Sequence, residues 1–303
     1  MTGILLSVSG HDIEISNPDK VLFPADELTK GDLIDYCRRI AEVALKHYRD
    51  RPLSMHRFPD GIDAEGFFQK QAPEYFPDWI KRVRLAKEDG EVDHVVANNA
   101  ATLVYLANQA CITAHLALAR ADHPQHPDRL IFDLDPSDDD FSKVQETAAA
   151  LKALLDQLEL PVFVQTTGSR GLHLVIPLDR QADFDAARAF SDQVSRNLAG
   201  QHPNLMTVEK RKNKRGDRVY LDIQRNAYGQ TSVAPYAVRA RPGAPVATPL
   251  AWKEAMAGDL DPRKYHMGNI FRRLARVDDP WVAIARHACS LSRARERLDR
   301  VAG

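Results

Sequence analysis

Hydrophobic and polar positions alternate in short blocks along this chain and predict a mixture of strands and helices. Apolar residues recur at helical spacing from Leu33 to Tyr48, and Thr29 with Asp32 resembles a capping box that opens this helix. The first residues alternate around Gly10-His11-Asp12, which predicts a hairpin. The remaining predicted elements are strands around Val83 and Val95, a helix at 98–120, a strand at 130–135, a helix at 138–158, strands at 162–166 and 172–178, a helix at 184–198, strands flanking a basic turn at 210–218 and a helical tail from about 262.

This order of elements indicates a mixed α/β (α+β) fold. We expect a single domain over residues 1–303, with an N-terminal subdomain at about 1–95, a catalytic core at about 96–260 and a helical C-terminal tail at about 261–303. Hydrophobic residues at 44% and charged residues at 27% are typical of a soluble globular protein.

Compartment and membrane features are also indicated by the sequence. The apolar runs are too short to span a bilayer, and the first residues lack the basic flank and long apolar stretch of a signal peptide. Cys37, Cys111 and Cys289 are widely spaced and show no zinc-binding pattern. We therefore expect a cytoplasmic protein.

The strongest chemical signal is the segment Leu-Ile-Phe-Asp-Leu-Asp-Pro, which ends at residue 136. On a strand, Asp133 and Asp135 share one face while Phe132 and Leu134 point to the core. Two carboxylates so close repel each other unless a cation lies between them, and Mg²⁺ or Mn²⁺ suits oxygen ligands. Asp222, within Val-Tyr-Leu-Asp-Ile, is a candidate third ligand from a neighbouring strand. The pattern predicts a paired-metal site that acts on phosphates.

A glycine-containing turn follows the acidic strand by one helix and one strand. In Thr-Gly-Ser-Arg-Gly-Leu-His, the hydroxyls of Thr167 and Ser169 are hydrogen-bond donors, and Arg170 and His173 add charge-assisted ones. The two glycines allow backbone N–H groups to converge on an anion. The segment therefore indicates a phosphate cradle, and an ordinary turn is the alternative. Upstream, Ser137 is interpreted as the N-cap of the next helix.

Positive charge is clustered even though the formal net charge is only -1. Arg225 and Arg239 could clamp a triphosphate. Phe67 and Phe68 suit stacking on an unpaired base, or belong to the core. A basic segment is either a solvated hairpin tip or a mobile arm that contacts nucleic-acid phosphates. It contains Lys210, Arg211, Lys212, Lys214, Arg215 and Arg218.

Together these motifs resemble the polymerase domain of bacterial DNA ligase D, in the archaeo-eukaryotic primase superfamily. The likeness runs from about Ser16 to Arg276. It rests, in order, on Asn-Pro-Asp-Lys-Val-Leu-Phe-Pro, Phe-Phe-Gln-Lys, Phe-Asp-Leu-Asp-Pro, Gly-Ser-Arg-Gly-Leu-His, Leu-Asp-Ile and Val-Ala-Pro-Tyr. The resemblance implies a primase-polymerase fold with an RRM-like catalytic sheet and a small N-terminal subdomain. Leu-Asp-Ile departs from the family's frequent Asp-Trp pairing, and Arg170 replaces a common lysine.

The resemblance also implies roles for individual residues. His115, expected on an apolar helix, falls where the family has a functional histidine, although it could equally be a core residue. The other implied roles are binding of two divalent cations (Mn²⁺ or Mg²⁺) by Asp133, Asp135 and Asp222; contact with the triphosphate by Thr167, Ser169, Arg170, His173, Arg225 and Arg239; binding of a 5′-phosphate by Lys20 and Lys30; and base stacking by Phe67 and Phe68.

The implied activity is template-dependent nucleotidyl transfer by two metals, which fills gaps and extends ends during non-homologous end joining. The expected ligands are DNA ends, gapped duplex with a 5′-phosphate, and NTP or dNTP. The protein partners that the resemblance suggests are Ku and a DNA ligase. Within the cytoplasm, the protein would associate with the nucleoid. Alternatives are a primer-initiating primase, a non-catalytic DNA-end-binding module and an Asp-nucleophile phosphatase. The phosphatase alternative expects Thr or Val two residues after Asp135, where Ser137 stands.

Overall fold

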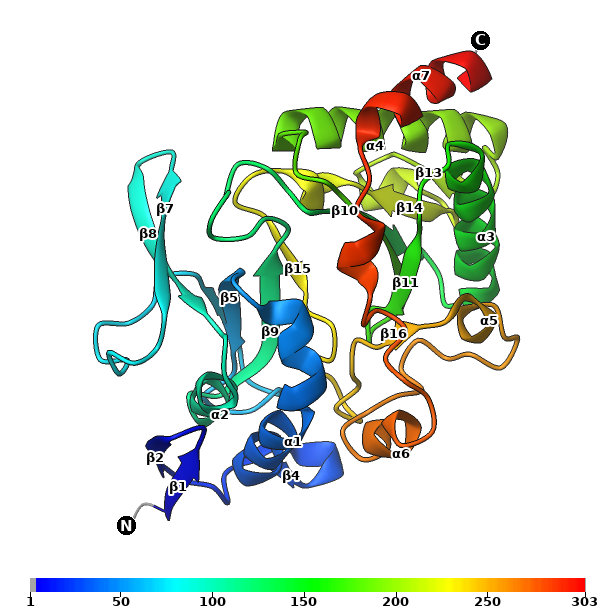
Figure 1. Ribbon diagram of the computed structural model, residues 1–303. Coiled ribbons are helices and arrows are strands. Elements are labelled where there is room, and N and C mark those ends of the chain that lie inside the picture. Colours follow the sequence, from blue (N-terminus) through cyan, green and yellow to red (C-terminus); the bar gives the residue numbers. More distant parts are fainter. Residues whose placement is uncertain (1–3, 303) are drawn as a thin grey trace. The chain divides into compact units, whose positions relative to one another are not determined.

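The computed structural model describes residues 4–302 and comprises two compact units, each assembled from separate segments of the chain (Figure 1). Unit 1 contains the described residues up to 117 together with 231–247 and 265–278. Unit 2 contains 118–230, 248–264 and the described residues from 279 onwards. The subdivision near residues 95 and 260 stays a prediction, because the units are defined by contacts and are not contiguous in sequence.

Unit 2 contains the acidic strand within a six-stranded sheet. Its elements are β10 (Arg129–Asp135), α3 (Phe141–Gln157), β11 (Phe163–Thr166), β12 (Leu172–Pro177), α4 (Phe184–Gln201), β13 (Met206–Thr207), β14 (Val219–Asp222), β16 (Pro249–Leu250), α5 (Trp252–Ala255) and α7 (Leu291–Ala302). The strand order is β13-β14-β10-β12-β11-β16. Four antiparallel strands, ordered β14-β10-β12-β11, alternate with α3 and α4 as β-α-β-β-α-β along the chain, which is the RRM-like topology. The predicted fold class is confirmed.

The side-chain alternation along β10 separates a buried face from a polar one. Phe132 and Leu134 have no exposed surface, and both α3 and α4 contact this strand and each other. Ile131 points to the opposite face, because successive strand residues alternate. There it joins Val175 and Trp281 in a second apolar cluster. Ile131 and Asp133 therefore lie on the same face of the sheet. The C-terminal segment covers this face at Ile131, and the polar side chains begin at Asp133.

Unit 1 is built on a sheet in the order β15-β9-β5-β8-β7, with β6 paired to β5. The predicted hairpin is present as β1–β2. The predicted capping box is present at the start of α1, where Asp32 N–H donates to Thr29 and Thr29 N–H donates to Asp32. Helices α1 and α2 pack against each other. The bounds are β1 (Ile4–Val8), β2 (His11–Ile15), β3 (Val21–Phe23), β4 (Leu28–Thr29), α1 (Lys30–Tyr48), β5 (Pro52–Arg57), β6 (Phe67–Gln69), β7 (Arg82–Lys87), β8 (Gly90–Val96), α2 (Ala100–Asn108), β9 (Cys111–Ala117), β15 (Thr231–Val233) and α6 (Ile270–Leu274).

The prediction of one helix at 98–120 is wrong. Helix α2 ends at Asn108, and Ala110 adopts a left-handed φ of 56°, after which the chain enters β9. Strand β9 pairs with β5 and β15. Apolar runs have no periodicity that separates a buried helix from a buried strand, so the sequence did not distinguish them. As a consequence, His115 lies on a strand and its neighbours come from adjacent strands.

Two predictions beside the acidic strand are also corrected. The N-cap of α3 is Asp140, whose carboxylate accepts from Ser142 N–H, whereas Ser137 Oγ donates to the Arg218 carbonyl at 2.6 Å. The basic segment is not a hairpin tip, because β13 and β14 run parallel and the chain must cross over between them.

The C-terminal segment and the cysteines complete the description. The predicted helical tail is helical in parts, with α6 in unit 1 and α7 packed against α4 in unit 2. Cys37, Cys111 and Cys289 are free thiols. Among residues 4–302 there is no helix with the length and apolar character needed to cross a bilayer.

Candidate active site

A row of polar side chains crosses four neighbouring strands of unit 2. Asp133 on β10 lies opposite His173 on β12 and opposite Asp222 on β14, and His173 in turn lies opposite Gln165 on β11. Directly opposite residues project from the same face of a sheet, and Asp135 joins them because it is two residues from Asp133. One carboxylate oxygen from each of the three acids lies within 4.8 Å of the others. The structure therefore brings the three predicted acids together in a cluster that could hold a metal ion.

The acids repel one another in a partly dehydrated environment. Burial, followed by the charges of Asp133 and Asp222, raises the pKa of Asp135 to about 6. Asp222 Oδ1 accepts a hydrogen bond from the Gln224 N–H at 2.8 Å, which orients that carboxylate. Burial and the charge of Asp222 raise the pKa of the Tyr220 hydroxyl to about 12. Both pKa shifts are caused first by burial and then by the neighbouring carboxylates on this face of the sheet.

His173 is oriented by a residue that the sequence reasoning missed. Gln165 Nε2 lies 3.2 Å from His173 Nδ1, and His173 Nε2 lies 3.3 Å from Asp133 Oδ1. The Gln165 amide is therefore within hydrogen-bonding distance of one ring nitrogen, and the other ring nitrogen faces Asp133. Gln165 is only 2% exposed. An amide side chain directly after Phe163 and Val164 in a predicted strand was the signal that could have identified it.

The predicted cradle is a turn held by its own first residue. Thr167 Oγ1 accepts from the N–H groups of Ser169 and Gly171, both at 3.2 Å. Gly168 has a φ of 63°, which favours glycine, and Arg170 is exposed. A Cβ on Gly171 would lie 2.0 Å from the Leu134 carbonyl oxygen. This glycine is therefore required for close approach to the acidic strand.

Arg215 attaches the basic loop (residues 208–218) to the same sheet. Arg215 is 9% exposed, its guanidinium lies 3.8 Å from the centre of the Tyr220 ring, and it donates to the carbonyls of Glu209 and Lys210. Arg225, in a short 3₁₀ helix after β14, is half-buried. Arg218 is half-buried, and the other predicted cations of the loop are exposed, namely Lys210, Arg211, Lys212 and Lys214.

Unit 1 contains the predicted aromatic and histidine residues. Phe67 and Phe68 are 45% and 60% exposed, so the core interpretation is wrong. The Phe68 ring stacks on His56 with centroids 4.1 Å apart, and His115 meets it edge-on at 5.2 Å. Burial, followed by the charge of Arg239, lowers the pKa of His56. His56, which sequence reasoning missed, thus interacts with three predicted residues: Phe68, His115 and Arg239.

The two predicted phosphate-binding lysines are also neighbours within unit 1. Lys30 is 5% exposed and donates to Ser16 Oγ at 3.0 Å and to the Asn108 carbonyl at 3.3 Å. Burial, followed by the charge of Lys20, lowers its pKa. Lys20 Nζ forms an exposed ion pair with Asp60 at 2.7 Å. A buried ammonium next to a second lysine favours an anionic ligand.

A family model and two curated relatives all match this chain to LigD proteins. The family model of the LigD primase-polymerase domain matches residues 29–281. The multifunctional non-homologous end joining DNA repair protein LigD of Mycobacterium tuberculosis is 34% identical over 282 residues, which cover 90% of this chain and 37% of that protein. The bifunctional LigD of Bacillus subtilis is 30% identical over 271 residues, covering 89% and 43%. The chain therefore spans less than half the length of these relatives.

A solved structure matches over nearly its whole length. The polymerase domain from Mycobacterium tuberculosis Ligase D, in complex with DNA, has a TM-score of 0.85 and 32% sequence identity to this chain. The match covers 91% of this chain and 99% of that one.

Proposed function

This chain belongs to the LigD primase-polymerase family, and on that basis we propose that it is a template-directed nucleotidyltransferase. Its task would be to fill gaps and extend DNA ends during non-homologous end joining, in concert with Ku and a DNA ligase. The observation that carries the proposal is the convergence of Asp133, Asp135 and Asp222 on adjacent strands.

The acidic cluster fits divalent cations. Its donors are hard carboxylate oxygens, and the raised pKa of Asp135 reflects burial and, after it, repulsion by Asp133 and Asp222, which a bound cation would relieve. We propose two ions, Mn²⁺ or Mg²⁺, held by Asp133, Asp135 and Asp222. When bound, such ions supply Lewis-acid chemistry that activates a hydroxyl nucleophile and neutralises phosphate charge.

The other residues of unit 2 would position the nucleotide. His173, whose Nε2 lies 3.3 Å from Asp133 Oδ1, would present an imidazole edge beside the triphosphate. Thr167, Ser169 and Arg170 would contact phosphate oxygens from the turn, and Arg225 would add positive charge. His115 and Arg239 are also proposed to bind nucleotide, as the resemblance to the family implies.

DNA contacts are proposed for the remaining predicted residues. Lys20 and Lys30 would bind the 5′-phosphate at the far side of a gap, and the exposed rings of Phe67 and Phe68 would stack on a base. The cations of the basic loop would neutralise backbone phosphates.

A gapped-duplex assay tests the proposed function. The protein is incubated with primer-template substrates that have or lack a 5′-phosphate, with NTP or dNTP, in Mn²⁺ or Mg²⁺. We expect templated extension to the end of the gap. Binding of the duplex without any incorporation under all conditions would instead support a non-catalytic end-binding module.

Metal binding should depend on pH through Asp135. A raised carboxyl pKa means that the metal-free folded protein holds a proton that is lost as pH rises through about 6, so protons compete with the cation below that value. The affinity for Mn²⁺ should be about tenfold weaker at pH 5 than at pH 7. Thermal unfolding with and without MnCl₂ measures this. The stabilisation by Mn²⁺ should grow between these pH values, and equal stabilisation at both would contradict the assignment.

Replacing Lys30 by glutamine should weaken selection of 5′-phosphorylated gaps. Glutamine retains donors for Ser16 and Asn108 but removes the charge, and one charge-assisted hydrogen bond corresponds to about a tenfold change in affinity. The ratio of extension on phosphorylated and unphosphorylated gaps measures the effect. Lys46→Gln, at an exposed position on the same helix, is the control and should leave that ratio unchanged.

A further inference from the structure

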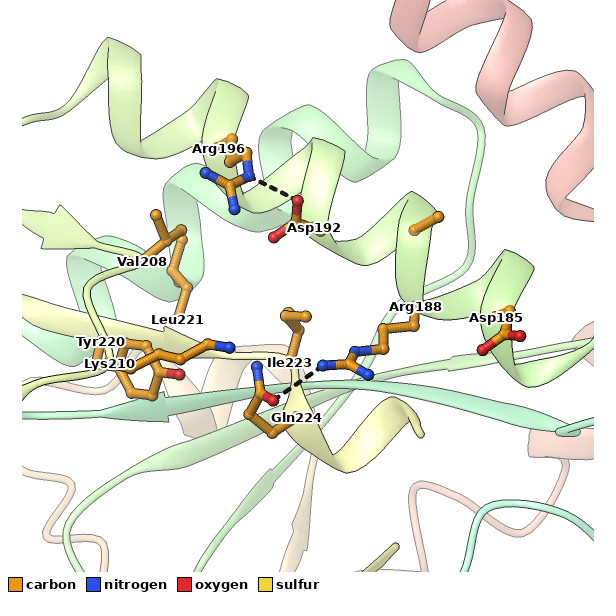
Figure 2. A pocket seen from close by; sticks show the side chains of 11 residues that line it. Asp185, Arg188, Asp192, Arg196, Val208, Lys210, Tyr220, Leu221, Ile223 and Gln224 are labelled. Carbon is orange, nitrogen blue, oxygen red and sulfur yellow. Dashed lines mark hydrogen bonds and ion pairs between the residues drawn. The ribbon is translucent and has the colours of Figure 1, made fainter. Parts of the chain in front are cut away.

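A cavity of about 380 Å³ lies beside β14 on unit 2, apart from the acidic cluster. Helix α4 supplies one wall with Arg188, Asp192 and Arg196, the basic loop supplies Lys210, and β14 with its 3₁₀ extension supplies Tyr220, Leu221, Ile223 and Gln224 (Figure 2). The cavity exists because β13 is only two residues long, so no strand follows the edge of β14 beyond Tyr220. Its size is in the range of small-ligand pockets.

The charges in this cavity are not fully compensated. Asp192 is paired with Arg196 at 2.6 Å, and Asp185 lies in the first turn of α4, where it complements the helix dipole. Among the residues that the structure describes, no carboxylate pairs with the guanidinium of Arg188 or the ammonium of Lys210. Two cations facing one cavity without acids of their own favour an anionic ligand.

Arg188 and Lys210 point toward the same place. Arg188 Nη2 donates to Gln224 Oε1 at 3.1 Å, and Figure 2 shows Lys210 extending toward Gln224 from the opposite side. The rest of the loop adds positive charge at Arg211, Lys212 and Lys214, all exposed. An anion that entered between Arg188 and Lys210 would therefore meet two donors inside the cavity and a basic rim outside it.

We propose that this cavity is a phosphate-binding site that uses Arg188 and Lys210 as its ligand-contacting cations. The phosphate is either a phosphodiester of a nucleic-acid strand or a free pyrophosphate, which share the same chemistry. Gln224 connects this site to the acidic cluster, because its side chain lines the cavity while its N–H holds Asp222 at 2.8 Å. Lys210 is shared with the basic loop of the proposed function, whereas Arg188 belongs to the cavity alone. Binding at the cavity requires neither metal nor catalysis, so it can be tested separately from the proposed nucleotidyl transfer.

The test compares the intact protein with the double variant Arg188→Gln and Lys210→Gln in EDTA, which removes divalent cations. Calorimetric titration with sodium pyrophosphate should show at least a tenfold loss of affinity at one site in the variant. Binding of a single-stranded 12-mer, measured by anisotropy across a salt series, should lose about 1.4 from the magnitude of its log–log salt slope, since two phosphate contacts disappear.

Matched variants make the outcomes distinguishable. The double variant Arg263→Gln and Lys253→Gln, at exposed positions elsewhere on unit 2, is the charge-matched control and should bind both probes as the intact protein does. If the Arg188→Gln and Lys210→Gln variant loses affinity for the 12-mer alone, the ligand is a strand phosphate. If it loses affinity for pyrophosphate alone, the ligand is the free anion. If the folded double variant, judged by its unchanged melting temperature, binds both probes like the control, the proposal is overturned. The Asp135→Asn variant should bind both probes as the intact protein does. This result would separate binding at the cavity from any failure of catalysis.

Discussion

Replacing Asp135 with asparagine is expected to abolish nucleotide addition, with a loss of about 10³-fold or more, while duplex binding is retained. The substitution keeps the size of the side chain but removes one of three carboxylates that lie within 4.8 Å of one another. A metal-ion contribution of about 4 kcal/mol to the transition state corresponds to a factor of this size. Single-turnover primer extension in Mn²⁺ measures the effect.

The same variant, although inactive, should be more stable than the intact protein when no metal is bound. At pH 8 the Asp135 carboxylate is ionised in spite of its burial and of the charges of Asp133 and Asp222, and both effects destabilise the folded state. The metal-free variant, which lacks this charge, should therefore melt at a higher temperature than the intact protein at pH 8. Asp139→Asn, on the exposed acidic run that follows, is the control and should alter neither extension nor melting. Full extension by the Asp135 variant would remove the basis of the assignment.

Replacing Gly171 with alanine is the second change with a large expected effect. Its Cβ would lie 2.0 Å from the Leu134 carbonyl oxygen and 3.1 Å from the Leu134 carbonyl carbon, so the backbone of one strand must move. Overpacking of this kind costs about 3 kcal/mol. Because Leu134 lies between Asp133 and Asp135, the movement should also displace the acids and reduce extension sharply.

The contrast with another glycine tests this explanation. A Cβ on Gly200, near the end of α4, would meet no atom within 4 Å, so Gly200→Ala should stabilise the protein by about 0.5–1 kcal/mol. Melting temperatures of the two variants should therefore move in opposite directions. Similar melting of the Gly171 variant and the intact protein would show that the strands can relax without cost.

The sequence predicted the features that depend on local periodicity. The alternation of Phe132, Asp133, Leu134 and Asp135 indicated which side chains are buried and which share a face, and this holds in the structure. The order of strands and helices around this motif indicated the sheet that contains it. Asp222 was a candidate third ligand from its place on a predicted strand, and the resemblance strengthened that candidate. Periodicity alone could not establish its meeting with the other two acids, because pairing between β10 and β14 joins residues far apart in the sequence.

Other features depended on tertiary context and were missed or wrong. His115 lies on a strand because β9 finds partners on both sides, which an apolar run does not specify. Arg215 resembled the other cations of its segment in sequence, but in the structure it stacks on Tyr220 and fastens the loop. Gln165 and Gln224, which orient His173 and Asp222, are polar residues whose roles become visible only when strands pair.

The central claim is that Asp133, Asp135 and Asp222 together hold divalent cations. It is tested most directly by anomalous X-ray diffraction from crystals soaked in MnCl₂ near pH 7.5. The account predicts manganese peaks within bonding distance of all three carboxylates, and loss of these peaks in the Asp135→Asn variant. Manganese bound elsewhere in the crystal, with no peak among these three side chains, would contradict it.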